Sequence, residues 1–110
     1  MTGERFIEVW VTCPDRATAE AIAEALVAAE LAACANIMPA VSSIYRWKGA
    51  IERAEEVPLV LKTRASHFTE IADRVAALHP YEVPAIVATD IAFIERRYAD
   101  WLIAETGTAR

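Results

Sequence analysis

The stretch that decides the fold is ANIMPAVSSIYRWKGAIERAEEVPLVLKT, residues 35–63. The Lys48-Gly49 pair near its middle is typical of a tight turn. The residues on either side are rich in β-branched and aromatic side chains, which favour strands. The stretch therefore predicts a hairpin. Because both arms exceed the roughly five or six residues of an ordinary strand, we expect the hairpin to project beyond a small sheet.

Side-chain alternation gives the first arm of this hairpin two faces. One face carries Val41, Ser43, Tyr45 and Trp47, and the other carries Ser42, Ile44 and Arg46. Pro39 and Pro58 lack an N–H group for a neighbouring strand, so each indicates a sheet edge or a bulge. A lone tryptophan at the hairpin tip would expose a large apolar surface, so we expect Trp47 to pack against a neighbouring subunit.

The segments around the hairpin predict two more strands, at 6–12 and 85–91, and three helices, at 15–34, 66–78 and 94–106. Asp15 and Ser66 are the expected N-caps, and Pro80 is expected to end the second helix. The order β-α-β-β-α-β plus a C-terminal helix predicts an α+β, ferredoxin-like fold: an antiparallel sheet with two helices on one face. The uncovered sheet face and the long hairpin favour self-association.

Length and composition predict a single domain over residues 1–110. The formal net charge of −5 disfavours binding to nucleic acids or to anionic membranes. The only apolar run near the N-terminus contains charges, and two cysteines are too few for a disulfide-rich secreted scaffold. We therefore expect a cytoplasmic protein.

Sequence motifs for catalysis are missing. The chain has no nucleophile elbow and no phosphate-binding loop, and it contains only three glycines. His67 follows Ser66 at an expected helix start and is expected to be exposed. An enzyme built around Lys62, His79 and Glu82 is the last-ranked alternative, so we expect a protein without enzymatic activity.

The stretch LHPYEVP, residues 78–84, predicts a stiff segment because its two prolines restrict the backbone. We interpret it as the wall of a ligand cleft between subunits. The candidate cleft residues are Lys62, Tyr81, Glu82, Tyr45, Trp47 and Glu56. Lys62 stands on an otherwise apolar strand and needs a partner, for which Glu82 is the candidate. The alternative interpretation is a helix stop whose polar groups satisfy one another.

Cysteine thiolate and histidine imidazole are the ligand types that copper and zinc prefer. The candidates are Cys13, Cys34 and His79, which lack the short spacings of a strong metal motif. Cys34 is more simply explained as a small buried residue. Cys13 stands before Pro14 at a strand end and is expected to be more open. Cys13 and His79 are therefore the candidate metal ligands.

Several motifs together resemble the CutA family of divalent-cation tolerance proteins. They are LAACANIMPAVSSIYRWKGAIE (31–52), EVPLVLKT (56–63) and HPYEVP (79–84), with CPD (13–15) and YADWL (98–102) extending the match. The resemblance implies a ferredoxin-like fold assembled as a compact homotrimer, similar in shape to the PII signalling proteins. It also implies an association with copper and other divalent cations.

The copper ligands assigned in some bacterial family members correspond here to Val11, Leu78 and His79, so only the histidine is retained. Cys13 lies two residues beyond the expected cysteine, on the same side of a regular strand. The family often has a proline and a glycine before its last helix. Asp90 and Ile94 occupy those places here, and the loop between them is expected to be helical instead.

Two functions follow as expectations. The first is a cytoplasmic homotrimer of the divalent-cation tolerance type that binds copper, another metal ion or a small ligand at clefts between subunits. The alternative is a PII-like signalling or adaptor protein that binds a small ligand or a partner protein, through its hairpins, without a physiological metal. In both cases the expected partners are copies of the same chain, with no nucleic acid and no membrane.

Overall fold

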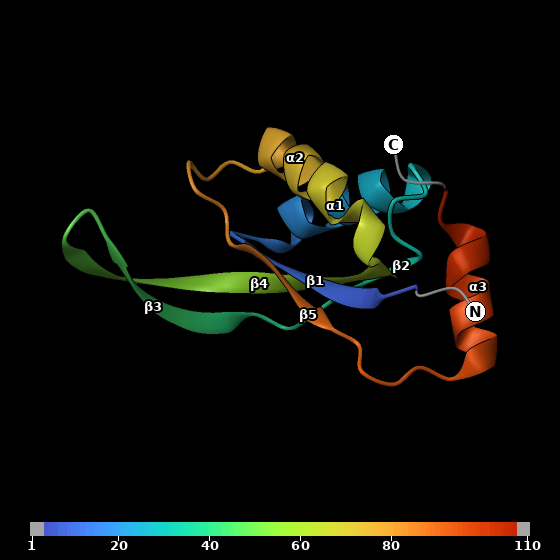
Figure 1. The fold of residues 1–110 in the computed structure, drawn as a ribbon. Coiled ribbons are helices and arrows are strands. Elements are labelled where there is room, and N and C mark those ends of the chain that lie inside the picture. The colour runs from blue at the N-terminus through green and yellow to red at the C-terminus, as the bar shows by residue number, and fades with distance from the viewer. Residues whose placement is uncertain (1–3, 108–110) are drawn as a thin grey trace.

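A five-stranded antiparallel sheet forms the centre of the computed structural model, which describes residues 4–107 (Figure 1). In chain order the elements are β1 (Phe6–Cys13), α1 (Arg16–Ala28), β2 (Cys34–Ile37), β3 (Val41–Trp47), β4 (Ala50–Arg64), a 3-10 turn (Ala65–His67), α2 (Phe68–Leu78), β5 (Ile86–Asp90) and α3 (Arg96–Glu105). The strand order is β2-β4-β1-β5, and β3 also pairs with β4. The predicted α+β class and antiparallel sheet are confirmed.

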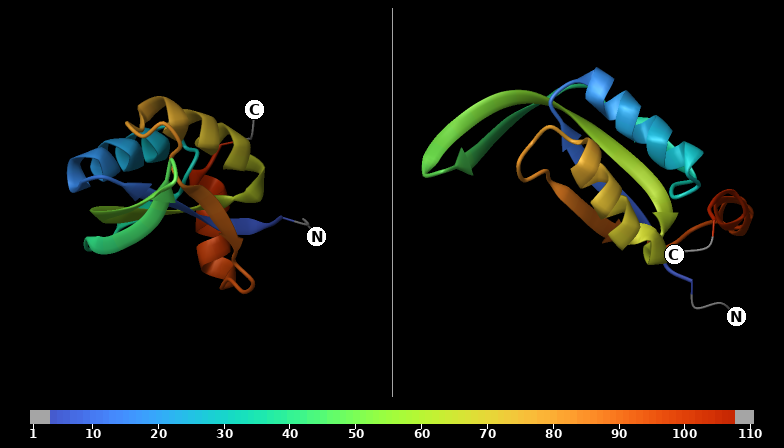
Figure 2. Two further views of the ribbon diagram at one scale, coloured as in Figure 1. Left: turned by 90° about the vertical axis from the view of Figure 1, so that its left-hand side faces the viewer. Right: turned by 90° about the horizontal axis from the view of Figure 1, so that it is seen from above.

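The core lies between the sheet and the two helices α1 and α2, which cover one of its faces (Figure 2). Alternate residues of β1, namely Ile7, Val9, Val11 and Cys13, are buried on this side. Ile22 and Leu26 of α1 and Ile71 and Val75 of α2 are fully buried in the same core. Each such aliphatic side chain contributes roughly 1.5–3 kcal/mol through burial, which fixes β1 against both helices.

The observed helices begin and end where the sequence predicts in some cases but not in others. Asp15 caps α1 as predicted, accepting a hydrogen bond of 2.8 Å from the Thr18 amide. α1 ends earlier than predicted, because Glu30 adopts a positive φ of 61° and turns the chain. α2 ends at Leu78, and His79 is extended before Pro80, as predicted.

The predicted start of α2 is wrong. The 3-10 turn (Ala65–His67) precedes α2, so Ser66 is not its N-cap, and no side chain makes a capping hydrogen bond there. The expectation that His67 is exposed is also wrong. Its side chain is only 1% exposed, because the turn directs it into the protein. Its two ring nitrogens have no hydrogen-bond partner among the residues that the structure describes.

The hairpin differs from the prediction in its first arm. Residues 38–40 interrupt it, so that β2 and β3 both pair with the 15-residue strand β4. Pro58 lies on β4 opposite this interruption and Pro39 lies within it, which explains how the sheet accommodates both. Lys48 and Gly49 have φ values of 50° and 84°, the type I′ geometry expected of a two-residue hairpin turn.

The hairpin projects from the sheet as predicted. The longest extent of the molecule is 49 Å, against 25 and 23 Å in the other directions. Figure 2 shows that the projecting arm curves rather than running straight. Its side chains include Ile44 and Ile51, which are 62% and 69% exposed. The arm therefore offers apolar surface that the chain itself does not cover.

α3 stands at one end of the sheet (Figure 1). It begins at Arg96, because the Glu95 side chain accepts a hydrogen bond from the Tyr98 amide at 3.1 Å and Glu95 itself is extended. Residues 91–95 are not helical, so the expectation of a helical loop between Asp90 and Ile94 is wrong. Phe93, within that loop, is 94% exposed.

The second face of the sheet is open in the described part of the chain. Trp10 and Val87 are partners in register on this side, and Val87 is 57% exposed. β5, the edge strand beside β1, is mostly exposed along its length. No helix within residues 4–107 is long and apolar enough to cross a membrane.

Candidate functional site

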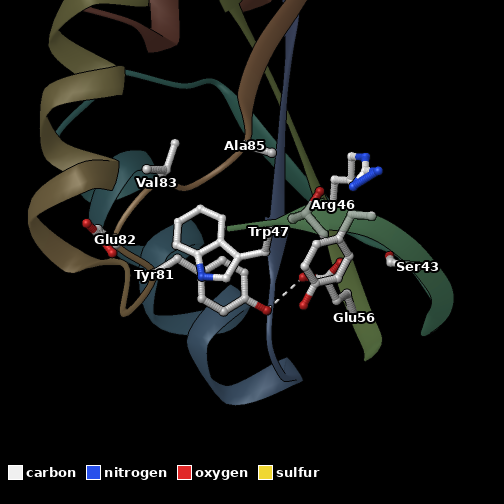
Figure 3. Close-up of a pocket in the computed structure, with 10 residues that line it drawn as sticks. Ser43, Arg46, Trp47, Glu56, Tyr81, Glu82, Val83 and Ala85 are labelled. Carbon is white, nitrogen blue, oxygen red and sulfur yellow. Dashed lines mark hydrogen bonds between the residues drawn. The ribbon is translucent and has the colours of Figure 1, made fainter. Parts of the chain in front are cut away.

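A pocket of about 520 Å³ lies between the hairpin and the segment 81–85 (Figure 3). Five of the six predicted cleft residues line it: Tyr45, Trp47, Glu56, Tyr81 and Glu82. The sixth, Lys62, does not. The residues that the sequence reasoning missed are Thr12, Ser43, Arg46, Val83 and Ala85. The structure thus brings most of the predicted cleft together within one chain.

The register of the hairpin explains how its residues reach the pocket. Val41 pairs with Glu56 and Tyr45 pairs with Glu52, so Glu56 lies on the same face as Tyr45 and Trp47. The alternation predicted from the sequence places Ser43 on this face as well. That pattern is the signal that would have added Ser43 to the site.

The centre of the pocket is a hydrogen bond from the Tyr81 hydroxyl to Glu56 Oε2, 2.7 Å long. Glu56 is 6% exposed, which is unusual for a carboxylate. Burial, and then the hydrogen bond to Glu56, raise the pKa of Tyr81 well above its ordinary value of 10.0. Tyr81 therefore remains a protonated donor at neutral pH and stabilises the negative charge of Glu56.

His79 is buried and uses both ring nitrogens within the chain. Nε2 lies 2.8 Å from the Thr12 carbonyl oxygen, and Nδ1 accepts a hydrogen bond of 3.1 Å from the Tyr81 amide. Because a carbonyl only accepts and an amide N–H only donates, the imidazole is neutral with its proton on Nε2. The rings of His79 and Tyr81 are 4.6 Å apart. His79 thus holds Tyr81 in place above Glu56.

Cys13 differs from the expectation of an open thiol. It ends β1 with its side chain fully buried on the helix-covered side, where alternation along the strand directs it. Burial, followed by the charges of Asp15 and Glu56, raises the pKa of Cys13 to about 11. The thiol is therefore protonated at neutral pH, whereas metals bind the thiolate.

The predicted metal ligands, Cys13 and His79, do not fit a metal ion as the chain is folded. A metal at His79 would have to displace one of its two hydrogen bonds, and a metal at Cys13 would have to deprotonate a buried thiol. Within residues 4–107 no three His, Cys, Asp or Glu side chains are grouped as a metal site. Cys34 is partly buried, with Sγ 3.4 Å from the Tyr98 hydroxyl.

Within a single chain, the structure does not bring Lys62 and Glu82 together. Lys62 lies near the end of β4, in register with Glu8 and Cys34. Glu82 lies instead near the hairpin tip, with Oε1 4.0 Å from Lys48 Nζ. The two residues are separated along the length of β4, so the sheet geometry keeps them apart. The lysine nearest the pocket is Lys48, at the turn.

Comparison with known proteins gives one consistent family. Residues 7–105 match the family model described as CutA1 divalent ion tolerance protein. The chain is 48% identical over 99 residues to the divalent-cation tolerance protein CutA of Thermus thermophilus, covering 90% of this chain and 96% of that protein.

Solved structures agree with the sequence comparison. The structure of the Thermus thermophilus protein superposes with a TM-score of 0.89 at 47% identity, covering 93% of this chain and 99% of that one. CutA1 from Oryza sativa gives a TM-score of 0.90 at 34% identity and covers 94% of each chain.

A third structure, that of the periplasmic divalent cation tolerance protein CutA from Archaeoglobus fulgidus, gives a TM-score of 0.88 at 36% identity, covering 91% of this chain and 97% of that one. The family model, the Thermus relative and all three structures thus cover nearly the whole of the fold described above. The chain belongs to the CutA1 divalent ion tolerance family.

Proposed function

We propose that this protein is a homotrimer without enzymatic activity that contributes to divalent-cation tolerance in the cytoplasm by binding a small ligand in the pocket between the hairpin and residues 81–85. The observation that carries the proposal is the buried Glu56 carboxylate, which lies at the pocket with the Tyr81 hydroxyl as its donor. A buried charge in a pocket is costly, and such groups are typical of binding sites.

The trimer is supported by the apolar surface that one chain leaves uncovered. Ile44, Ile51, Val87 and Phe93 are each more than half exposed, on the hairpin, the edge strand and the loop before α3. Ile44 and Ile51 share one face of the hairpin, and exposed apolar side chains gathered on one face usually mark an interaction site. Assembly through the hairpin would place a neighbouring chain beside the pocket and make it a cleft between subunits. Gel filtration coupled to light scattering tests this, with an expected mass three times the 12.1 kDa of the chain.

The family name keeps a metal ion as a second candidate ligand. The geometry favours a small molecule, because Cys13 is a buried protonated thiol and both nitrogens of His79 are already hydrogen-bonded. The ligand-bound state would then be recognised by a partner protein through the projecting hairpins, as in the adaptor alternative.

Calorimetry separates these candidates. The purified protein is titrated with Cu(II), with Zn(II) and with nucleotides, and mass spectrometry identifies any small molecule that copurifies. We expect a copurified or titrated small molecule whose binding is lost in Glu56→Gln. Tight Cu(II) binding that His79→Ala abolishes would overturn the small-molecule proposal in favour of the metal.

A further inference from the structure

We infer that the pocket binds a small organic cation through its ammonium group, held by the aromatic rings of Trp47 and Tyr81 and by the carboxylate of Glu56. This inference rests on the proposed function, because it names the chemical class of the ligand for the same pocket. A volume of about 520 Å³ lies in the range of small-molecule sites. We therefore assign the ammonium to a free small molecule.

Aromatic side chains form much of the wall. Tyr45 and Trp47 project from one face of β3. Tyr81 comes from the segment after α2 (Figure 3). The face of an aromatic ring carries negative charge density and attracts cations, and sites lined by such rings recognise quaternary ammonium groups. Two chain segments thus supply three ring systems to one pocket.

The buried charge of the pocket is negative. Among residues 4–107, Tyr81 is the only hydrogen-bond partner of the Glu56 side chain, and a carboxylate has the capacity to accept several hydrogen bonds. The one cationic residue of the lining is Arg46, which is exposed and donates from Nη1 to the Gly49 carbonyl oxygen at 3.3 Å. Figure 3 shows its guanidinium directed away from Tyr81 and Glu56. An anionic ligand would therefore meet an uncompensated carboxylate.

The chain already holds an ammonium of its own at the rim. Lys48 Nζ lies 5.6 Å from the centroid of the Trp47 ring and 4.0 Å from Glu82 Oε1. Lys48 thus contacts an aromatic ring and a carboxylate, the same combination that we propose for the ligand ammonium. Its contacts lie at the rim of the pocket, where water reaches them. A ligand ammonium beside Glu56 would make the same contacts where water is less accessible, and electrostatic attraction is stronger there.

The test compares choline and butylammonium with 3,3-dimethyl-1-butanol, which has the shape of choline but no charge. Calorimetry of the full chain measures affinity, and the nitrogen–proton NMR signal of the Trp47 indole, assigned with Trp47→Phe, reports the place of binding. We expect the cations to bind at least about tenfold more tightly than the neutral alcohol, because a desolvated cation–π contact is worth that ratio. Binding should shift the Trp47 signal.

Three variants refine the test. Glu56→Gln removes the charge but keeps the shape, and should weaken cation binding about tenfold or more. Glu55→Gln removes the same charge from the neighbouring residue on the opposite face of β4 and should leave affinity unchanged. Lys48→Asn removes the competing ammonium, while asparagine tolerates the positive φ of that position, and should strengthen binding.

The outcomes decide between the two proposals. Equal binding of choline and the neutral alcohol, or cation binding that Glu56→Gln does not change, overturns the ammonium assignment. The assignment is also overturned if neither cation binds at millimolar concentration. If a different small molecule then binds and Glu56→Gln abolishes it, the proposed function stands and only the ligand class is wrong. If no small molecule binds at the pocket, both proposals fail.

Discussion

The phenol oxygen of Tyr81 lies 2.7 Å from a carboxylate oxygen of Glu56, and this contact joins the two stretches of sequence that build the pocket. The Tyr81 amide also donates to His79 Nδ1, and His79 Nε2 contacts the Thr12 carbonyl. A continuous series of hydrogen bonds therefore runs from the end of β1 through residues 79–81 to β4. The pocket wall is held in place before any ligand arrives, which reduces the entropy lost on binding.

Tyr81→Phe should destabilise the fold by about 1–2 kcal/mol, because it leaves the buried Glu56 carboxylate without its donor. Urea unfolding measures the change in the free energy of unfolding. The matched control is Tyr45→Phe, since the Tyr45 hydroxyl has no hydrogen bond within the described chain and its loss should cost less than about 0.5 kcal/mol. Equal effects of the two variants would show that the Tyr81–Glu56 contact contributes nothing specific.

His79→Ala should lower the free energy of unfolding by about 2–3 kcal/mol, because it removes two hydrogen bonds and a buried ring. Copper affinity, measured by calorimetry on the assembled protein, should not change. The opposite pattern, a normal melting temperature with lost copper binding, would establish His79 as a ligand. His67→Ala is the control for metal binding, because His67 is also buried but lies on the turn before α2.

Much of the site is predictable from the sequence, for a physical reason. Alternation fixes which residues of a hairpin share a face, so Tyr45 and Trp47 can be grouped from their spacing alone. Prolines fix the backbone locally, so residues 79–84 can be identified as a stiff segment. Both rules act over a few neighbouring residues and do not depend on contacts with distant parts of the chain.

The errors concern contacts between distant segments. Lys62 and Glu82 are paired in the sequence reasoning because Lys62 needs a partner, yet within one chain their separation depends on the length of β4. Cys13 is expected to be open because Pro14 follows it, but β1 keeps its alternation to the last residue and buries the thiol. The expected exposure of His67 depends on its neighbour Ser66, whereas its burial depends on the packing of a 3-10 turn.

Stability should fall in alkaline solution partly through Cys13. Its thiol pKa is raised from an ordinary value of 9.0 to about 11 in the folded state. Because the pKa is higher in the folded state, the protonated thiol favours the folded state, and this contribution to the free energy of unfolding is complete below about pH 9. The contribution is lost as the pH rises from about 9 to about 11. The loss should be on the order of 2 kcal/mol. Urea unfolding at intervals across that range measures it.

The control for this prediction is Cys13→Ala. The variant should be less stable at every pH, because it leaves a small cavity, but it should lose less stability between about pH 9 and 11 than the parent protein does. The charge of Cys13 is only a minor cause of the raised pKa of Tyr81, behind burial and the contact with Glu56, so the comparison chiefly reports the Cys13 thiol itself. If the free energy of unfolding falls equally with pH in the two proteins, the pKa of the Cys13 thiol is the same in the folded and the unfolded state, which contradicts the prediction.

The hairpin is the arm through which we expect chains to associate. Trp47 is 38% exposed near its tip, and Ile51 on its other face is 69% exposed. Neither side chain belongs to the core of its own chain. Trp47→Ala and Ile51→Ser should therefore weaken assembly, each by about tenfold or more in dissociation constant, while changing the unfolding of the isolated chain much less.

Light scattering over a dilution series measures assembly, and urea unfolding of the dissociated chain measures the fold. Val27→Ala is the control, because Val27 is also apolar and 39% exposed but lies on α1, away from the hairpin. We expect this variant to assemble like the parent protein. If Trp47→Ala and Ile51→Ser keep the parent mass at every dilution, chains do not associate through the hairpin, and the pocket is then closed by its own chain alone.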